Sequence, residues 1–240
     1  NPGIIVCIAS GFGQDGPYAA RTGFDMIAQA MSGAMAFTGF PDHPPARASV
    51  PYCDFGTAMF LALGVMFALY HRKDTGEGQM VDVSLFHTAL TFMMSPINEY
   101  MTRGIFRPQY GNASYWTITD TFKTQNGWVI IGAISNNIWK RLLRVIGRND
   151  LIDDPRFKTD QLRADNYHIL QPIIAEWMNK RSLEEALELL DKGRVPAGPV
   201  LKYSQVPDDP HVKHRKMIIP VDHPGAGPVP LIDTPVKLSK

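Results

Sequence analysis

Two aspartates stand beside apolar segments, where a carboxylate can do chemistry. Asp54 lies between a proline-rich stretch and the apolar run 55–70, and Asp25 follows Gly23-Phe24. The simplest interpretation of both is an N-cap, in which the carboxylate accepts from free helix N–H groups. A carboxylate at the edge of a dry core is also a stronger base and nucleophile, because burial disfavours its charged form. For Asp54 the two roles are compatible, since helix amides can also stabilise a nearby oxyanion.

A glycine-rich segment follows the first predicted strand. Gly11, Gly13 and Gly16 match the dinucleotide-binding pattern G-x-G-x-x-G. Pro17 follows the third glycine, where the phosphate-facing helix should already have begun, and no strand ending in an acidic residue follows about 20 positions later. We therefore interpret the segment as a strand-exit loop whose glycines permit positive φ. A nicotinamide oxidoreductase is the alternative that this motif leaves open.

Other reactive side chains give weaker signals. Cys53 has no histidine near it in the sequence, and a buried cysteine is usually inert. His211 and His214 have no third candidate ligand beside them, so we predict no metal site. Tyr115-Trp116 is interpreted as a core pair beside a strand pair, with a mobile aromatic lid as the alternative.

Hydrophobic patterning predicts the elements that must position these residues. In the first hundred residues it predicts strands at 3–9 and 80–85, and helices at 24–37, 54–70 and 84–100. Further on it predicts a hairpin of 117–123 with 128–133, helices at 137–146, 163–179 and 183–192, and a strand at 217–221. Pro172 should kink or split its helix, and Ser182 with Glu185 should form a capping box.

The composition is that of an ordinary globular protein, with 45% hydrophobic and 20% charged residues and a formal net charge of +1. A net charge near zero gives no electrostatic indication of binding to nucleic acid or to an anionic membrane surface. The run 55–70 is shorter than a membrane span, so we predict a buried helix and no contact with a membrane. With two cysteines and no signal peptide, we expect a cytoplasmic protein.

Charge is distributed unevenly along the chain. Residues 1–100 hold four of the 24 basic residues, eight of the 23 acidic residues and eight of the 11 methionines. So low a charge density is typical of a segment that other chain or another subunit covers. Because the chain also begins almost directly with a strand, we interpret it as a fragment.

Several short stretches occur together in a specific order. They are 10–14 with Gly16-Pro17, 23–25 with 29–33, Pro51 with Asp54, 75–79 with 81–85, 122–124 with 126–127, and 195–200. Taken together, they make almost the whole chain resemble the family III CoA-transferases, which include formyl-CoA transferase and carnitine CoA-transferase.

The resemblance implies an α/β fold with a Rossmann-like large domain, a small α/β domain and an interlocked homodimer. It places residues 1–100 in the large domain with the catalytic aspartate, 101–110 in a linker, 111–200 in the small domain, and 201–240 in a return segment toward the large domain. The chain would then lack the N-terminal part, which holds much of the CoA site, and the C-terminal end.

The family's nucleophilic aspartate falls on Asp54, and Asp25 matches an acidic residue near the active site, which implies a positioning role. The implied reaction moves CoA from an acyl-CoA to a small carboxylic acid through an aspartyl anhydride and an aspartyl-CoA thioester. The resemblance also implies that coenzyme A is a substrate and that no cofactor is bound permanently. Further substrate contacts are expected from Gly11, Phe12, Gly13, Gln14, Phe24, Gly111 and Asn112.

Two further alternatives stay open beside CoA transfer and the nicotinamide oxidoreductase. α-Methylacyl-CoA racemases are similar too, but their acid–base histidine falls at Phe24, which cannot transfer a proton. An inactive or binding-only fragment is the second alternative.

The chain also departs from formyl-CoA transferase in the lid, where Gly111-Asn112-Ala113-Ser114 replaces a run of glycines.

Overall fold

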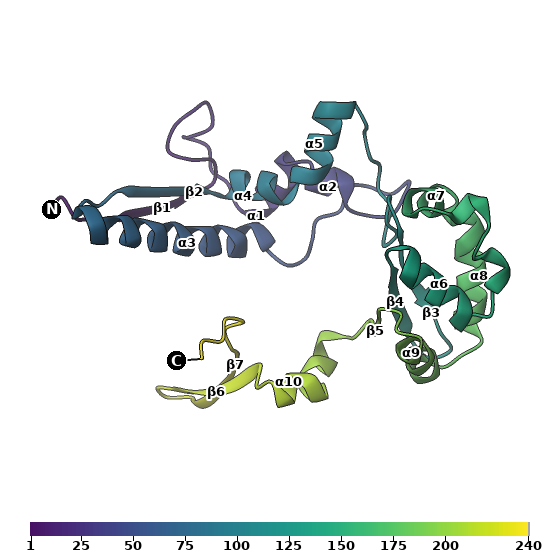
Figure 1. The fold of residues 1–240 in the computed structure, drawn as a ribbon. Coiled ribbons are helices and arrows are strands. Elements are labelled where there is room, and N and C mark those ends of the chain that lie inside the picture. The colour runs from purple at the N-terminus through teal and green to yellow at the C-terminus, as the bar shows by residue number, and fades with distance from the viewer. Residues whose placement is uncertain (240) are drawn as a thin grey trace. The chain divides into compact units, whose positions relative to one another are not determined.

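The computed structural model describes residues 1–239, which divide into two units. The first unit is Asn1–Tyr115, and the second begins at Trp116. Figure 1 follows the chain through both, from purple at the N-terminus to yellow at the C-terminus. The small domain was predicted to begin at residue 111, whereas the boundary between the units lies after Tyr115. Residues 104–115 pack against the rest of the first unit. The mixture of helices and strands confirms the predicted α/β class.

A pair of parallel strands organises the first unit. β1 (Val6–Ser10) pairs with β2 (Met80–Ser84), with Val6 opposite Met80 and Ser10 opposite Ser84. Parallel strands need a long crossover, and here it includes α3 (Tyr52–Thr75), which packs against both strands (Figure 1). The ends of both strands therefore lie together, beside the glycine-rich loop.

Two predicted helices of this unit are each broken into two. The segment predicted as one helix at 24–37 forms α1 (Asp25–Met31) and α2 (Ala34–Phe37), which are separated at Gly33 with φ of 85°. The segment predicted at 84–100 forms α4 (Leu85–Phe92) and α5 (Met94–Arg103), which are separated at Met93. Ser84 caps α4 by accepting from the His87 N–H. Apolar composition continues across both breaks, so hydrophobicity alone did not reveal them.

Helix α3 corrects two predictions. It begins at Tyr52 after Pro51, so Asp54 lies in its first turn and is not the N-cap. It was predicted to be buried, yet many of its apolar side chains are exposed in this chain: Phe55, Met59, Phe60, Leu63, Met66, Phe67 and Tyr70. The helix is longer than the charge-free run 55–70, so the length of that run does not exclude a membrane-spanning helix. By length and composition α3 could cross a membrane, a test that core helices of soluble proteins also pass, and 22% of its apolar window is buried.

The second unit contains a three-stranded antiparallel sheet. The predicted hairpin is confirmed as β3 (Ile118–Lys123) with β4 (Trp128–Ala133), and β5 (Ala197–Pro199) pairs with the other edge of β4. The helices are α6 (Asn136–Val145), α7 (Asp160–Asp165), α8 (Tyr167–Asn179) and α9 (Leu183–Lys192), with short 3-10 turns at Asn149–Leu151 and Pro155–Phe157.

Short sequence patterns predicted the bounds of some of these helices correctly and those of others wrongly. The bounds of α9 match the prediction, and Ser182 Oγ accepts from the Glu185 N–H as a capping box requires. The Glu185 carboxylate instead lies 3.5 Å from Arg181. The helix predicted at 163–179 is interrupted at Asn166, whereas Pro172 lies inside α8. Pro172 therefore does not split the helix, and the alternative that it kinks the helix stays a prediction.

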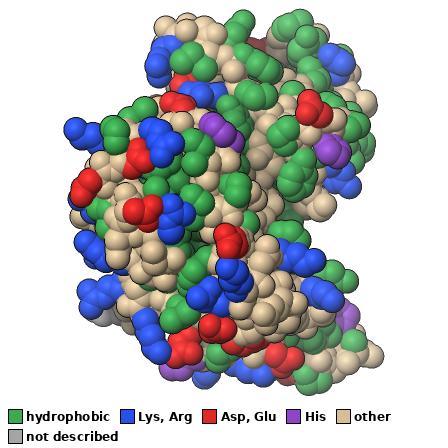
Figure 2. Space-filling model, turned by 90° about the vertical axis from the view of Figure 1, so that its right-hand side faces the viewer, with side chains coloured by type: hydrophobic (Ala, Val, Ile, Leu, Met, Phe, Trp, Pro, Cys, Tyr) green, Lys and Arg blue, Asp and Glu red, His purple; other side chains and the backbone are tan. Residues whose placement is uncertain are grey.

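Most of the hydrophobic core lies in the second unit. Alternate residues of β3 and β4 face the helices there, and the fully buried side chains include Ile118, Phe122, Val129, Ile131, Trp139, Leu142, Leu170 and Leu190. The buried cluster of the first unit consists of Ala28, Cys53 and Ala89. Many apolar side chains of the first unit are exposed, among them Phe24, Phe55 and Met59. Figure 2 shows one face of the molecule, with apolar side chains in green among the charged ones. The unit with few charges is thus also the one with little core of its own.

The last segment forms a 3-10 helix (Tyr203–Asp208), α10 (Pro210–His214) and a hairpin of β6 (Ile218–His223) with β7 (Gly227–Ile232). The predicted strand at 217–221 is confirmed. Its partner β7 was missed because Pro228 and Pro230 are unfavourable in strands, and they are tolerated at an edge. The described residues contain no group of three metal-binding side chains, at His211 or elsewhere.

Candidate functional site

The loop after β1 is a tight turn whose backbone N–H groups donate to two side chains. Ser10 Oγ accepts from the Gly13 N–H at 2.9 Å, and Asp82 accepts from the Gln14 N–H at 3.3 Å. A Cβ on Gly11 would lie 3.1 Å from the Cα of Gly23, so the loop lies directly against the segment that leads into α1. Gly13 and Gly16 have positive φ, and no helix begins at the third glycine. The geometry is that of the predicted strand-exit loop rather than a dinucleotide fingerprint.

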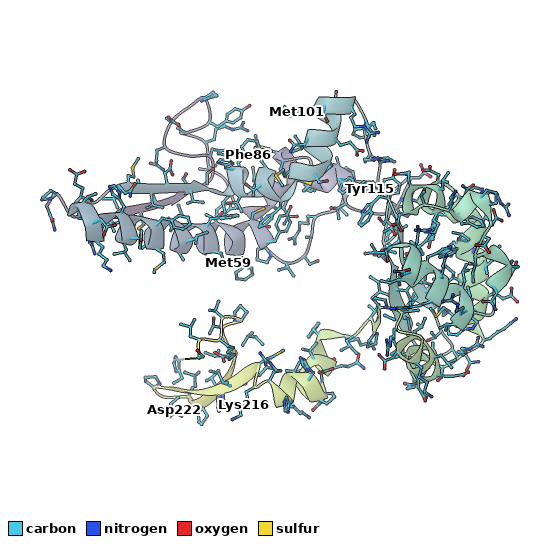
Figure 3. The ribbon with its side chains drawn as sticks, viewed as in Figure 1. Met59, Phe86, Met101, Tyr115, Lys216 and Asp222 are labelled. Atoms are coloured by element: carbon cyan, nitrogen blue, oxygen red, sulfur yellow. The ribbon has the colours of Figure 1, made fainter. Side chains whose placement is uncertain are left out.

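Phe12 anchors this loop by aromatic packing. Its ring centroid lies 5.6 Å from that of Tyr18 and 5.9 Å from that of Phe86, which is labelled in Figure 3. The Arg21 guanidinium lies 5.7 Å from the Phe12 ring and 4.7 Å from the Tyr18 ring. Phe12 therefore has a structural function in this chain, and its contact with substrate stays a prediction, as does that of the exposed Phe24.

Asp25 joins the start of α1 to the start of α3. Its side chain is buried, with the residue 4% exposed. Oδ1 accepts from the Cys53 N–H at 2.9 Å, and Oδ2 accepts from Gln29 Nε2 at 2.6 Å. The first N–H groups of a helix have no partner within it, and Cys53 is the second residue of α3. Asp25 thus caps α3 from another helix, one residue away from Asp54.

Gln29 completes this network and was not singled out from the sequence. It is 1% exposed, and its Oε1 accepts from the Ala48 N–H at 2.9 Å. The signal that could have found it is its spacing of four residues from Asp25, which places both side chains on one face of α1. Its contact with Ala48 joins residues that are 19 apart, and no local pattern predicts that.

The Asp54 carboxylate itself is exposed, while the backbone around it is fixed. Thr57 Oγ1 donates to Thr88 Oγ1 of α4 at 2.9 Å, and a Cβ on Gly56 would lie 2.7 Å from the Phe92 ring. Asp25 and α4 therefore both hold this turn of α3. We expected Asp54 at the edge of a dry core; the described residues leave it exposed and do not provide that desolvation.

Cys53 and Tyr52, which precede Asp54, carry neutral side chains. Burial and the nearby Asp25 carboxylate raise the pKa of the Cys53 thiol to about 12. Burial, with Cys53 beside it, raises the pKa of Tyr52 to about 12. A protonated, fully buried thiol is a poor nucleophile, which supports the prediction that Cys53 is inert and leaves Asp54 as the reactive candidate of this turn.

The predicted linker and lid pack against residues of the first unit. The Gly111 N–H donates to Gly39 O at 2.7 Å, and a Cβ on Gly111 would lie 2.6 Å from the Phe40 ring. Gln109 Nε2 donates to Thr38 O at 2.7 Å. Asn112 lies in the turn that follows Gly111. Part of the predicted linker thus packs on the rest of the first unit, and the linker assignment and the substrate contacts of Gly111 and Asn112 stay predictions.

Tyr115 belongs to this packed segment. Its ring lies 6.0 Å from that of Phe37 and 4.6 Å from the Arg107 guanidinium, and Glu99 binds Arg107 through two hydrogen bonds of 2.8 Å. Figure 3 labels Tyr115 at the end of the first unit. These contacts favour a packed position over a mobile lid for Tyr115, whereas Trp116 is exposed, so the two do not form the predicted core pair.

Comparison with known proteins assigns this arrangement to a family. The model of CoA-transferase family III matches residues 1–240, and the chain belongs to that family. It is 37% identical to the succinyl-CoA–D-citramalate CoA-transferase of Chloroflexus aurantiacus, over 100% of this chain and 60% of that protein. It is 32% identical to the formyl-CoA:oxalate CoA-transferase of Streptomyces avermitilis, over 100% of this chain and 62% of that protein.

Solved structures agree with this assignment. A CAIB/BAIF family protein from Brucella suis matches with a TM-score of 0.81 and 32% identity, over 100% of this chain and 62% of that one. Rv3272 from Mycobacterium tuberculosis matches with a TM-score of 0.87 and 25% identity, over 100% and 64%. The chain thus spans about 60% of the length of the curated relatives it matches.

Proposed function

We propose that the protein to which this chain belongs transfers CoA from an acyl-CoA thioester to a small carboxylic acid, with Asp54 as the nucleophile. One observation carries this proposal. In a chain matched throughout by a CoA-transferase family, Asp54 presents an exposed carboxylate on a helix turn whose backbone is fixed by the buried Asp25.

The first half of the reaction loads CoA onto the enzyme. An Asp54 oxygen attacks the thioester carbonyl carbon of the donor, the C–S bond breaks, and CoA leaves as a thiolate. The thiolate then attacks the γ-carbon of Asp54 in the mixed anhydride, and the donor acid leaves as a carboxylate. Asp54 now carries CoA as a thioester, so the activated carbonyl is retained on the enzyme.

The second half repeats these steps in reverse order. The acceptor carboxylate attacks the γ-carbon of Asp54, and the CoA thiolate leaves. The thiolate attacks the acyl carbon of the acceptor, which departs as its CoA thioester while Asp54 returns to a carboxylate. Asp54 lies in the first turn of α3, and the positive end of this helix favours the negative charge that develops when its γ-carbon is attacked.

Water must be excluded throughout, because it would hydrolyse both intermediates. Asp54 and much of α3 are exposed in the described residues, so this cover must come from other chain. We propose that the interlocked homodimer implied by the resemblance provides it. The exposed apolar side chains of α3, among them Met59 at 64% and Phe67 at 65%, support this proposal.

The names of the relatives suggest the substrate class. The similar proteins are named for succinyl-CoA or formyl-CoA with D-citramalate or oxalate. We therefore propose a short-chain acyl-CoA donor and a small acceptor acid with two carboxylates. The proposed compartment is the cytoplasm, where reducing conditions would keep Cys7 and Cys53 as the free thiols they are here.

The test uses the full-length protein with succinyl-CoA and a panel of acceptor acids, and detects new CoA thioesters by mass spectrometry. We expect turnover that depends on the acceptor and falls by roughly 1,000-fold or more in Asp54→Asn, as on loss of a covalent nucleophile. Asp74→Asn, at the exposed other end of α3, should retain activity. Full activity of Asp54→Asn would refute the proposal.

The same protein can be tested for racemisation. That reaction needs a second acid–base group, which Phe24 cannot provide. We expect no deuterium incorporation from D2O at the α-carbon of the acyl group when no acceptor is present. Incorporation under those conditions would support the racemase alternative instead.

A further inference from the structure

The side-chain amide of Gln29 is fixed in one orientation by its partners. Oε1 accepts from the Ala48 N–H at 2.9 Å, and Nε2 donates to Asp25 Oδ2 at 2.6 Å. A backbone N–H can only donate and a carboxylate can only accept, so the reverse orientation would lose both hydrogen bonds. Because Gln29 is 1% exposed, water cannot replace either partner.

These contacts form a chain of three hydrogen bonds that ends beside Asp54. It runs from the Ala48 N–H through Gln29 to Asp25, and from Asp25 to the Cys53 N–H at 2.9 Å. The segment 48–53 is thereby held at both ends by side chains of α1. This segment leads into the first turn of α3, so the position of the segment determines the position of Asp54.

We infer that Gln29 is a positioning residue for the Asp54 nucleophile, and that it acts through Asp25. The inference rests on the proposed function. Without the Gln29 donor, Asp25 Oδ2 is buried with no partner and the carboxylate is free to rotate away from the Cys53 N–H. The turn that carries Asp54 then loses its link to α1, and the nucleophile no longer stays aligned with the thioester carbonyl.

The charges around Gln29 make this inference testable by titration. Asp25 is the carboxylate in direct contact, and Tyr52 and Cys53 of α3 stay neutral because each has a pKa of about 12. Asp54 follows on α3, His87 is the titratable residue of α4, and α2 has none. The segment before α3 adds Asp42, His43 and Arg47.

Two substitutions separate positioning from packing. In Gln29→Glu the protonated carboxyl can donate to Asp25 as the amide does, whereas the ionised one repels it. Burial and the Asp25 charge raise the pKa of the introduced carboxyl, so we expect kcat to recover as pH falls from about 8.5 to 6. Gln29→Met keeps the length of the side chain and loses all three of its hydrogen bonds, so its kcat should be low at every pH relative to the wild type.

A matched pair on the second unit serves as the control. Gln161 Nε2 donates to Asp165 Oδ1 at 2.8 Å with the same spacing of four residues, but this pair is exposed on α7. Gln161→Glu should leave kcat and its pH profile as in the wild type. Any general effect of placing two carboxylates four residues apart on a helix is thereby excluded.

Hydrogen exchange provides a readout that does not depend on the reaction. We expect the amides of Cys53 and Asp54 to exchange faster in Gln29→Met than in the wild type, whether or not the protein transfers CoA. If the wild type fails to transfer CoA but this difference is present, the proposed function fails and the link from Gln29 to α3 stands.

We expect kcat of Gln29→Met to fall by about 10- to 100-fold, the scale of a misplaced reacting group, with a much smaller change in KM. The inference is overturned if both variants keep the wild-type kcat. It is also overturned if the kcat of Gln29→Glu does not recover at low pH and, in Gln29→Met, the amides of Cys53 and Asp54 exchange as slowly as in the wild type.

Discussion

The Asp25 carboxylate accepts a hydrogen bond from the Cys53 N–H at 2.9 Å, across 28 residues of sequence. Asp25 is the first residue of α1 and Cys53 is the second residue of α3, so one carboxylate lies at the positive ends of two helices. Negative charge is favourable at both ends. The position of the candidate nucleophile Asp54 is therefore set by α1 as well as by its own helix.

Removing the Asp25 charge should loosen this junction. In Asp25→Asn the oxygen can still accept from Cys53, but the new amide NH2 then faces the NH2 of Gln29, and one buried donor has no acceptor. We expect the free energy of unfolding to fall by about 1–3 kcal/mol, measured by denaturant titration. Asp74→Asn, at an exposed site on α3, should change it far less. Equal effects of the two substitutions would contradict the network.

Gly111 should be required where it packs on Phe40. It has φ of 64°, and a Cβ there would lie 2.6 Å from the Phe40 ring. Gly104 has nearly the same φ, 67°, with open space around it. Alanine costs roughly 1–2 kcal/mol in this conformation alone, so Gly104→Ala should lower stability by about that amount and Gly111→Ala by more. Denaturant titration of both variants compares them, and equal losses would show that the contact with Phe40 is unimportant.

Asp160 should make the second unit sensitive to acid. Its Oδ1 accepts from Thr117 at 2.8 Å and from the fully buried Arg163 at 2.7 Å. Burial raises the pKa of this carboxyl, but the hydrogen bonds and the Arg163 charge outweigh it and hold the pKa below its ordinary value. A lowered pKa in the folded state stabilises the fold above the unfolded value of about 3.9, and this stabilisation is lost as pH falls further.

The substitution Asp160→Asn tests this account. It leaves the buried Arg163 without its charge partner, while the Asp160 side chain itself is 30% exposed, so stability at pH 7 should fall by about 1–3 kcal/mol. Between about pH 5 and 3 the variant should then lose less further stability than the wild type. Asp208→Asn, which breaks the exposed pair with Lys213, should have little effect at pH 7. If the stability of the wild type and that of Asp160→Asn fall in parallel with pH, the role of Asp160 is contradicted.

Cys53 should resist alkylation in the folded protein. The residue is fully buried, and its pKa of about 12 keeps the thiol protonated at pH 8. Iodoacetamide, followed by peptide mass spectrometry, should modify Cys53 only after denaturation. Modification of Cys53 in the native protein would show that the first turn of α3 opens readily, against the rigid junction described above.

Local patterns predicted most elements but few of the contacts. Ser182 and Gly193 bracket α9 with signals that lie within a few residues, so its bounds were correct. Likewise, alternating apolar residues around Asn126-Gly127 identified the hairpin of β3 and β4. Asp54 was misplaced as the N-cap because an acid beside an apolar run looks the same in the first turn of a helix as before it.

The site depends on contacts between residues far apart in the sequence. Nothing near Asp25 indicates that Cys53 will be its partner, and nothing near Gln29 indicates Ala48. The exposure of α3 agrees with the low charge density of residues 1–100, which indicates a segment that other chain or another subunit covers. The resemblance to a family located Asp54, whereas the structure shows what holds it.

The most direct test of the central claim is to identify the residue that becomes acylated. Full-length protein would be mixed with succinyl-CoA and quenched with hydroxylamine, which attacks the activated γ-carbonyl and leaves an aspartyl hydroxamate. We expect peptide mass spectrometry to locate the hydroxamate at Asp54 in the wild type and in Asp74→Asn, and to find none in Asp54→Asn. A hydroxamate at another acidic residue, or turnover with no modification of Asp54, would contradict the mechanism.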